Sequence, residues 1–277
     1  MELNDVSIVI VTFKSENKIF SCLDSIPQNH DIFIIENSND INFKNKVERI
    51  NNRITCILTG ENKGYSVANN IGLSKVKTKY ALVLNPDTKL NKNAIKNFLR
   101  RAQEHPDFWL IGPGNDQKTY ALSESQKINE VNNLKGFAIF FNLKKFNHKY
   151  FDENYFLYFE EIDLCKKVKK KGGKILIDKE IIIKHEGASS VKKDKKLEFE
   201  KNRNWHWMWS TFYFHKKYKG FFKAIFIILP KLLSSLIKTI FYQLIFNRYQ
   251  RDIYYCRLSG ILNSILGKKS WYRPSID

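Results

Sequence analysis

The chain has 277 residues, of which 43% are hydrophobic, so it can bury one large core, and general disorder is excluded. The formal net charge is +19; from residue 165 onward Lys and Arg number 26 against 8 Asp and Glu, whereas residues 1–164 hold 21 and 20. A near-neutral first part and a basic second part predict two roles, and basic surface attracts phosphorylated substrates, anionic lipid or nucleic acid. A general lysine bias is the alternative.

The cysteines do not indicate a metal site or a disulfide framework. Cys22, Cys56, Cys165 and Cys256 are scattered, with no CxxC pair and no His at zinc spacing. Such cysteines are typical of a reducing cytosol. The start of the chain lacks the basic segment and long apolar run of a signal peptide. We therefore expect the N-terminal part to stay in the cytoplasm.

Strands and helices alternate over the first third of the chain. Continuous β-branched runs predict buried strands at residues 6–13, 31–36, 54–58 and 80–84. Apolar residues at helical spacing predict helices at residues 15–26, 44–50, 66–76 and 91–104. This alternation indicates an α/β fold, an open sheet with helices on both faces, whose ligands bind beyond the C-terminal strand ends.

The alternation weakens after Pro106. Further strands are predicted at residues 134–141, 174–177 and 181–184, and a loop that enters a helix at residues 155–171. The remainder has a helical pattern. The predicted domains are residues 1–196 and a basic, aromatic helical tail, residues 197–277.

Polar side chains stand where the predicted strands end. They lie in four segments, Thr12-Phe13-Lys14, Glu36-Asn37-Ser38-Asn39-Asp40, residues 62–72 and Asn85-Pro86-Asp87-Thr88. A nucleotide-sugar needs a base reader, a ribose contact and a group that holds its diphosphate, and carboxylates and amides at strand ends suit the first two. Asp87 is suited to hold a cation, since Mg²⁺ and Mn²⁺ prefer carboxylate oxygen and bridge phosphates. Taken alone, its segment is more often an ordinary turn.

A fifth segment, residues 151–165, places Glu160, Glu161 and Asp163 at the start of a predicted helix, beside many aromatic residues. Apolar surroundings raise the pKa of a carboxyl group and make it a better base. Helix capping is the alternative role for these acids. His185 is the first residue of a sixth segment, residues 185–190. Its role is either structural, that of a metal ligand or that of a phosphate contact.

In this order and spacing, the six segments resemble family 2 glycosyltransferases, in particular the bacterial rhamnosyltransferase-like branch. That branch carries an SIVIVTYN-type start, a VDN-type strand end, an NxGFxxAxNxG stretch, LNPD, FDExFFxYxEDxDLCxR and a late His. The likeness spans residues 6–190, and residues 257–268 show a weaker resemblance to the same family. It implies a GT-A fold, an open mixed sheet with helices on both faces.

The resemblance also implies an activity. The enzyme would be an inverting glycosyltransferase that uses Mg²⁺ or Mn²⁺ and takes sugar from a nucleotide-diphosphate donor. The acceptor would be a glycan or a polyprenyl- or lipid-linked molecule, in the synthesis of surface polysaccharide or lipopolysaccharide. The branch favours dTDP-rhamnose, with UDP- and GDP-sugars as further candidates.

Each matching residue receives an implied role. Glu161 would be the catalytic base that deprotonates the acceptor hydroxyl, with Glu160 and Asp163 as alternatives. Asp87 and His185 would hold the metal. The nucleotide-sugar would contact Thr12, Phe13, Glu36, Asn37, Asn62, Gly64, Asn70, Asn85 and Asp87. The acceptor side would include Gly136 and Tyr158.

Three residues depart from the family pattern. Glu161 stands where the family has Asp; the extra methylene moves the carboxylate by about one carbon–carbon bond, and an error of that order can cost about 100-fold in rate. Glu36 also replaces Asp, which affects base preference. Lys167 stands where the family often has Arg.

Residues 221–246 are apolar and long enough to cross a bilayer, but Lys223, Lys231 and Lys238 recur along them and Pro230 interrupts them. A Lys near the bilayer centre costs about 2.5–3.5 kcal/mol. The lysine spacing keeps the charges on one side, so we expect helices that lie in the interface of an anionic membrane, attached peripherally to the inner face of the cell membrane. A packing or dimerisation face and a true span are the alternatives.

Parts of the sequence also suit other classes of protein. The Glu160-Glu161 pair also suits a catalytically inactive relative that binds a nucleotide-sugar. The charge suits a nucleic-acid-binding protein, but the basic part is rich in apolar runs and carries no nucleic-acid motif, so no nucleic acid is expected. A dinucleotide-dependent dehydrogenase is excluded, because residues 14–18 contain no glycine.

Overall fold

The computed structural model describes residues 5–114, 127–186 and 196–273, which form two compact units. The first unit holds residues 5–114, 127–152 and 160–186, and the second holds residues 153–159 and 196–273. The predicted boundary at residue 196 places residues 153–159 in the first domain instead. Residues 187–190 of the sixth segment lie outside the described residues.

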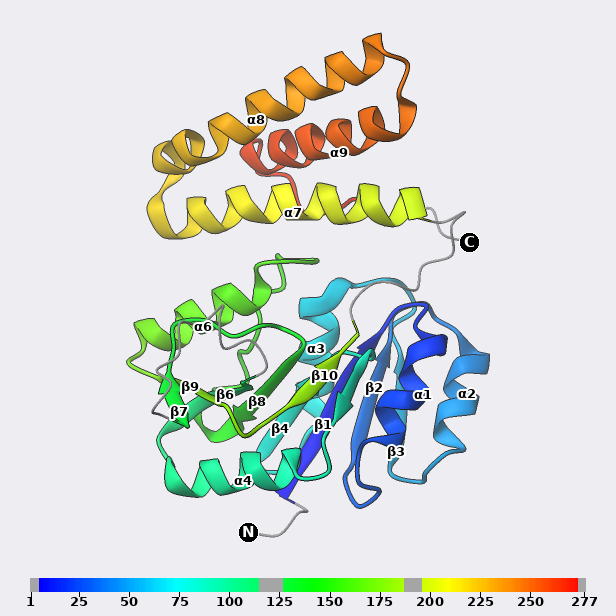
Figure 1. Ribbon diagram of the computed structural model, residues 1–277, viewed down its shortest axis with the longest axis vertical. Helices are drawn as coiled ribbons and strands as arrows, with labels where there is room; N and C mark the ends of the chain where they lie inside the picture. Colours follow the sequence, from blue (N-terminus) through cyan, green and yellow to red (C-terminus); the bar gives the residue numbers. More distant parts are fainter. Residues whose placement is uncertain (1–4, 115–126, 187–195, 274–277) are drawn as a thin grey trace. The chain divides into compact units, whose positions relative to one another are not determined.

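An eight-stranded mixed sheet is the centre of the first unit (Figure 1). Its strands are β1 (Val6–Thr12), β2 (Ile32–Glu36), β3 (Ile54–Leu58), β4 (Tyr80–Leu84), β6 (Phe108–Pro113), β7 (Ile128–Glu130), β8 (Ala138–Asn142) and β9 (Lys174–Asp178). The order along the sheet is β3-β2-β1-β4-β8-β6-β9-β7. Strands β1 to β4 are parallel, whereas β8 runs antiparallel to β4 and β6.

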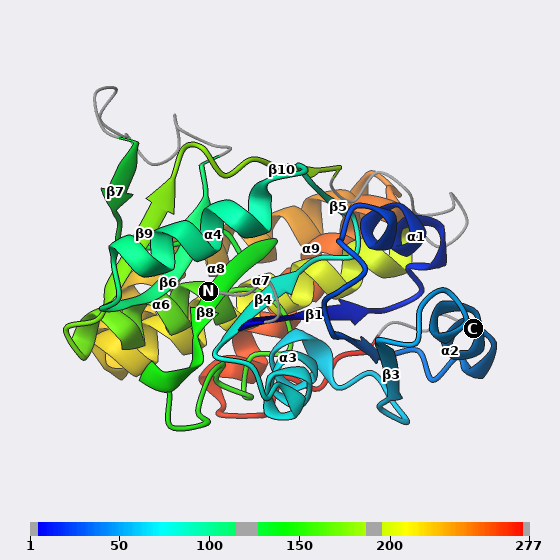
Figure 2. The same ribbon diagram turned by 90° about the horizontal axis from the view of Figure 1, so that it is seen from below.

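Helices cover both faces of this sheet, as predicted. They are α1 (Glu16–Asp24), α2 (Ile41–Glu48), α3 (Gly64–Lys75), α4 (Ala94–Glu104) and α6 (Glu160–Lys170), and a short 3₁₀ helix spans Leu143–Lys145. Because side chains alternate along a strand, Ile8 and Ile10 of β1 join the core under α1, α2 and α4, and Val9 joins the core under α3 and α6. Figure 2 shows α4 and α3 on opposite sides of the strands.

A glycine lets α3 pack close to β1. A Cβ added at Gly72 would lie 2.4 Å from Val9 Cγ1 and 3.2 Å from Ile35 Cγ1. Glycine in a helix interior costs about 1 kcal/mol relative to alanine, so its presence here reflects this close approach. The last glycine of the segment at residues 62–72 therefore sets the helix-to-sheet distance.

A second, two-stranded sheet lies beside the end of β4. It pairs β5 (Thr88–Leu90) with β10 (Ile183–His185) in antiparallel fashion, so that His185 is opposite Thr88. Two segments nearly a hundred residues apart in sequence are thereby brought together. This pairing places His185 next to the turn that contains Asp87.

The structure confirms the mixed α/β fold, and the predicted elements within residues 6–104 are all present, with ends shifted by three residues or fewer. The pattern does not indicate β5, β6 or β7. Two of these have three residues, too few to show alternation, and β6 ends in Gly112-Pro113, which is unusual in strands. The predicted strand at residues 134–141 begins too early, since β8 starts at Ala138.

Three long helices make up most of the second unit. They are α7 (Lys196–Lys219), α8 (Phe221–Leu244) and α9 (Arg248–Ile265). Their shared core includes Met208, Phe212, Ala224, Ile228 and Ile261. Among the described helices, α8 is the one whose length and apolar composition would suffice to cross a membrane, and most of its surface is not buried by the rest of the chain.

Candidate active site

The turn after β4 presents Asp87. Both the backbone N–H and the hydroxyl of Thr88 donate to the Asn85 carbonyl oxygen, at 3.3 and 2.7 Å, which closes the turn. One Asp87 carboxylate oxygen, Oδ1, lies 3.4 Å from His185 Nε2. The Phe137 ring stacks on the His185 imidazole, with centroids 4.8 Å apart and 9° between planes. Two predicted metal residues therefore face each other in a fixed arrangement.

Asp87 is ionised at neutral pH. Burial by itself would raise the pKa of its carboxyl group, but the hydrogen bond and charge of His185, with a smaller contribution from Lys18, hold that pKa below its ordinary value. Within the described residues no group of three or more His, Cys, Asp and Glu side chains forms a metal cage. A carboxylate and an imidazole without further protein ligands fit a Mg²⁺- or Mn²⁺-type site whose other ligands come from substrate phosphates and water.

Tyr65 connects this turn to the acidic helix. Its hydroxyl oxygen lies 2.8 Å from the Gly136 carbonyl oxygen and 3.3 Å from Asn85 Oδ1. Burial raises the pKa of the Tyr65 hydroxyl, and the nearby charges of Glu160, Glu161 and Asp87 raise it further. The predicted base and the predicted metal ligand thus act electrostatically on the same hydroxyl group.

Glu160 and Glu161 occupy the first turn of α6. The Cα of Gly136 faces Glu161: a Cβ there would lie 3.6 Å from both Cβ and Cγ of Glu161. One oxygen of each acid, Oε2, is buried without a hydrogen-bond partner among the described residues. A buried carboxylate oxygen that lacks a partner is costly, which fits a site completed by a bound hydroxyl group.

The two acids differ in their surroundings. Burial raises the pKa of Glu160 well above its ordinary value, and the charge of Glu161 raises it further. Burial also raises the pKa of Glu161, but the backbone N–H groups of Glu161 and Ile162 oppose this by stabilising its carboxylate. Environments that separate two neighbouring carboxyl groups in this way assign them different roles. Burial therefore favours the protonated form more strongly at Glu160 than at Glu161, which favours Glu161 as the base.

Asp163 is fully buried and forms an ion pair with a lysine of the same helix. The Lys167 ammonium lies 3.9 Å from its Oδ2 and donates to the Tyr150 carbonyl oxygen at 2.7 Å. Lys167 therefore joins α6 to the loop that precedes it. The family often has Arg at the position of Lys167. This ion pair gives Asp163 a contact within α6, and its role as an alternative base stays a prediction.

Replacing Glu160 by Gln is expected to stabilise the fold at neutral pH. Because the folded state holds the Glu160 proton more tightly than the unfolded chain, its stabilising contribution is present below the ordinary glutamate pKa and is lost as pH rises towards the raised value. The variant should melt higher than wild type at pH 7–8, by about 2–4 °C for each kcal/mol gained. The difference should disappear near pH 4 in thermal melts, and a difference independent of pH would contradict this assignment.

The residues predicted at the nucleotide end lie at the ends of β1 and β2. Thr12 Oγ1 donates to the Ile35 carbonyl oxygen at 3.5 Å. Glu36 is buried, and its two carboxylate oxygens accept from the backbone N–H groups of Ser38 and Asp40, at 2.8 and 2.9 Å. Glu36 therefore holds its own loop in place, while its role as base reader stays a prediction. Phe13 is half-buried just after β1.

Asn37, Asn62 and Gly64 form the next loop. Asn37 Oδ1 accepts from the Thr59 hydroxyl at 3.0 Å, and its Nδ2 donates to the Gly64 carbonyl oxygen at 3.3 Å. Asn62 Oδ1 accepts from the Gly64 N–H at 3.1 Å. Gly64 has φ +82°, a left-handed conformation that favours glycine. These contacts shape the loop at the start of α3, where the nucleotide pocket is predicted.

The place of Asn70 in the nucleotide pocket stays a prediction, and Asn70 also has a structural contact. Its side chain bonds the backbone of Phe151 in both directions, with Nδ2 donating to the carbonyl oxygen and Oδ1 accepting from the N–H, each at 3.0 Å. It therefore fixes the loop before the acidic segment to α3. Tyr158, predicted on the acceptor side, belongs to the second unit, where Arg203 Nε donates to its hydroxyl at 2.8 Å.

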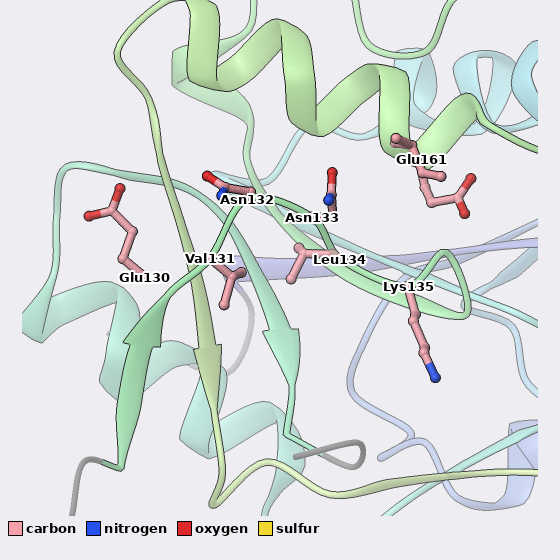
Figure 3. Close-up of a pocket in the computed structure, with 8 residues that line it drawn as sticks. Glu130, Val131, Asn132, Asn133, Leu134, Lys135 and Glu161 are labelled. Carbon is pink, nitrogen blue, oxygen red and sulfur yellow. The ribbon is translucent and has the colours of Figure 1, made fainter. Parts of the chain in front are cut away.

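A pocket of about 460 Å³ adjoins Glu161. It is lined by residues 130–135 together with Glu161 and Ile162 (Figure 3). Asn132, Asn133 and Lys135 are exposed there, and Glu161 extends from the first turn of α6 beside them. No motif in the sequence points to these residues. Tyr65 can be recognised from the sequence by its hydroxyl group, because the family pattern carries Phe at that position.

The fold and this site define a glycosyltransferase with a GT-A fold. A model of the family described as Glycosyl transferase family 2 matches residues 7–165. Because the match covers more than half of the chain, the protein belongs to this family. The family and the enzyme class predicted from the motifs are confirmed, whereas the rhamnosyltransferase-like branch stays a prediction.

Individual relatives agree with this family. The low-salt glycan biosynthesis hexosyltransferase Agl10 of Haloferax volcanii is 27% identical over 198 residues, and the match covers 61% of this chain and 63% of that protein. Less than two thirds of that relative's length is therefore matched.

Solved structures share the fold. The solved mannosyltransferase PcManGT from Pyrobaculum calidifontis, in complex with GDP-Man and Mn²⁺, has a TM-score of 0.60 at 11% identity, over 96% of this chain and 88% of its own. S. aureus TarS 1-349 in complex with UDP-GlcNAc has a TM-score of 0.53 at 15% identity, over 97% of this chain and 93% of its own. At these identities the structures show a shared fold.

Proposed function

We propose that the protein is an inverting, metal-dependent glycosyltransferase that moves a hexose-type sugar from a nucleotide-diphosphate donor to a glycan or lipid-linked acceptor. The observation that carries this proposal is the continuous link between Asp87 and Glu161. His185 beside Asp87 stacks on Phe137, and the neighbouring Gly136 faces Glu161. The Tyr65 hydroxyl contacts Gly136 at one end of this link and Asn85, in the turn of Asp87, at the other.

The reaction requires one proton transfer and one substitution at carbon. Glu161 accepts the proton of an acceptor hydroxyl, whose oxygen then attacks the anomeric carbon. The bond between that carbon and the diphosphate oxygen breaks, and the configuration inverts. Asp87 and His185 would hold a divalent cation, which neutralises the charge that develops on the departing diphosphate. Tyr65 keeps the Asn85 turn and the Gly136 backbone in register between these groups.

The donor sugar remains to be assigned by experiment. The sequence branch favours rhamnose, while the relatives include a hexosyltransferase and structures that hold GDP-Man or UDP-GlcNAc. A thermal-shift screen of dTDP-rhamnose, GDP-mannose and UDP-N-acetylglucosamine, each with and without Mn²⁺, should give one donor that raises the melting temperature only with metal. Release of the nucleotide on adding acceptor would then support transfer. Donor binding without release would favour the inactive relative instead.

The exposed face of α8 supports attachment to a membrane surface. Its outward stripe of large apolar side chains includes Phe222, Phe226, Ile237 and Leu244, which are 78%, 74%, 63% and 71% exposed. An apolar stripe of this length on one helix marks an interaction surface. The opposite side packs on α7 and α9, where Ala224, Ile228 and Ser235 are buried. We place α8 in the interface of an anionic bilayer on the cytoplasmic side.

A spanning orientation of α8 is disfavoured by its partner helix. Helix α9 packs along α8 and carries Arg251, Asp252 and Arg257. Arg251 donates to Gln243 of α8 at 3.0 Å. Crossing the bilayer would take these charges into hydrocarbon, at about 2.5–3.5 kcal/mol each near its centre. An orientation parallel to the surface keeps them in water or among headgroups.

Replacing Phe226, Leu233 and Ile240 together by Asp is expected to reduce binding to vesicles of phosphatidylcholine and phosphatidylglycerol by about 100-fold or more. Burial of each large apolar side chain contributes about 1.5–3 kcal/mol, and three are lost. Liposome flotation measures the bound fraction. The matched control replaces Ile41 and Ile50, exposed apolar residues of the first unit, by Asp and should float like wild type. Equal flotation of all three proteins would contradict membrane attachment through α8.

A further inference from the structure

Residues 153–159 lead directly into the acidic helix but pack within the helical unit. The Tyr155 ring is fully buried and meets Tyr213 of α7 edge to face, with centroids 5.0 Å apart. The Phe156 ring stacks on His206 of α7, with centroids 4.4 Å apart. The chain therefore enters α6 from a segment that is held by α7.

The last two residues of this segment adopt a backbone conformation that is rare for their type. Tyr158 and Phe159 have φ +69° and +70°. The left-handed region is uncommon for residues other than glycine, and bulky residues there need surroundings that enforce it. Two such residues in succession, immediately before Glu160, form a strained turn at the entrance to the candidate active site. Strain of this kind is concentrated at functional sites.

Side chains of α7 hold this turn. Arg203 Nε donates to the Tyr158 hydroxyl at 2.8 Å, and the Ser210 hydroxyl donates to the Leu157 carbonyl oxygen at 3.0 Å. The Trp207 ring contacts both strained residues, with centroids 5.2 Å from that of Tyr158 and 5.5 Å from that of Phe159. The three α7 residues lie at successive helical turns, so they form one continuous support.

We propose that Arg203, Trp207 and Ser210 are positioning residues, which fix the Tyr158–Phe159 turn and through it the Glu161 carboxylate. Since Glu160 is the first residue of α6, the dihedral angles of Tyr158 and Phe159 set the direction of the turn that carries Glu161. The three α7 residues would then act on catalysis through the chain that enters α6, apart from any role of the helices in membrane attachment. This inference rests on the proposed role of Glu161 as the base.

The first test is Trp207→Ala in the full chain, assayed with a soluble acceptor so that vesicle binding plays no part. We expect kcat to fall about 10- to 100-fold, because a displacement of about 1 Å at the reacting group costs about 100-fold. Donor affinity, measured by metal-dependent thermal shift, should remain within twofold of wild type. Trp207→Phe should recover most of the activity, since an aromatic ring is restored. Tyr249→Ala removes an exposed ring from α9 and serves as the matched control with wild-type kcat.

A second variant, Phe159→Gly, guards against simple unfolding. Glycine adopts φ +70° without strain, so the protein should fold, but the contacts of Phe159 with Trp207 and Phe214 are lost and the backbone is freed. We expect an unchanged melting temperature, or a higher one, together with a reduced kcat.

Wild-type kcat in Phe159→Gly and Trp207→Ala overturns the proposal. So does a loss of donor affinity as large as the loss of kcat. Failure of the proposed function is separate: it is seen as undiminished transfer by Glu161→Gln, whatever these variants do.

Discussion

Glu161→Gln is expected to lower kcat by about 1,000-fold while the KM for the donor changes little. A positioned general base contributes about 10²- to 10⁴-fold, and glutamine keeps the shape of the side chain but cannot accept the acceptor proton. The nucleotide part of the donor is predicted to bind at the strand ends of residues 1–100, whereas Glu161 acts on the acceptor hydroxyl, so its replacement leaves most donor contacts in place. A loss confined to kcat is the signature of an interaction made only in the transition state.

The pH dependence of wild type provides a second measurement. Burial raises the pKa of Glu161, so the base is protonated and inactive at low pH, and activity should rise with pH through that raised pKa. The residual activity of Glu161→Gln should lack this acidic limb. Steady-state kinetics between pH 5 and 9 would measure both effects.

Three controls separate the acids from one another. Glu104→Gln changes an exposed carboxylate paired with Arg101 and should keep wild-type kcat. Glu160→Gln mimics the protonated form that burial favours at Glu160, so its kcat should stay within about tenfold of wild type. Asp163→Asn should destabilise the fold, since it removes the charge of a buried carboxylate that pairs with half-buried Lys167. If Glu160→Gln lost more activity than Glu161→Gln, the two assignments would be exchanged.

The first hundred residues show how much of the fold a sequence can reveal. Their strands β1 to β4 are largely apolar and buried, and helices with clear periodicity separate them. The short strands β5 and β7 lack this signal. β7 has three residues that are exposed or half-buried, and β5 is a three-residue pair for β10, so both depend on partners distant in sequence. Non-local pairing of short strands cannot be inferred from local patterns.

The sequence predicts which residue types form the site, but it does not predict their contacts. The order of motifs pointed to Asp87, His185 and Glu161, which the structure connects through Phe137, Gly136 and Tyr65. Nothing in the spacing showed that Asn70 would bond the Phe151 backbone, or that both Glu36 oxygens would be engaged by their own loop. Amides and carboxylates satisfy whichever backbone groups the fold brings near them. Their roles therefore follow from tertiary contacts that the sequence does not display.

Asp87→Asn is expected to abolish the metal-dependent part of donor binding and to lower kcat/KM by about 100-fold or more. A cation on a transferring group supplies several kcal/mol of transition-state stabilisation, and each 1.36 kcal/mol is tenfold in rate. The Asp87 carboxylate is ionised throughout the working range because His185 lowers its pKa, so it is a full negative ligand at neutral pH. Asparagine keeps the size of the side chain and its carbonyl oxygen, but removes that charge.

The measurement that separates a metal role from a folding role is the melting temperature with and without Mn²⁺ and donor. In wild type, ligand that binds only the folded state raises the melting temperature. In Asp87→Asn the metal-dependent rise should vanish, while the melting temperature without ligand stays within a few degrees of wild type. Asp107→Asn is the matched control, since Asp107 is an exposed carboxylate paired with Lys174 and should leave the rise unchanged. His185→Ala should weaken the rise without removing it, because the carboxylate remains. An undiminished Mn²⁺ effect in Asp87→Asn would mean that the cation is held elsewhere, and the diphosphate would then have to be placed away from the turn after β4.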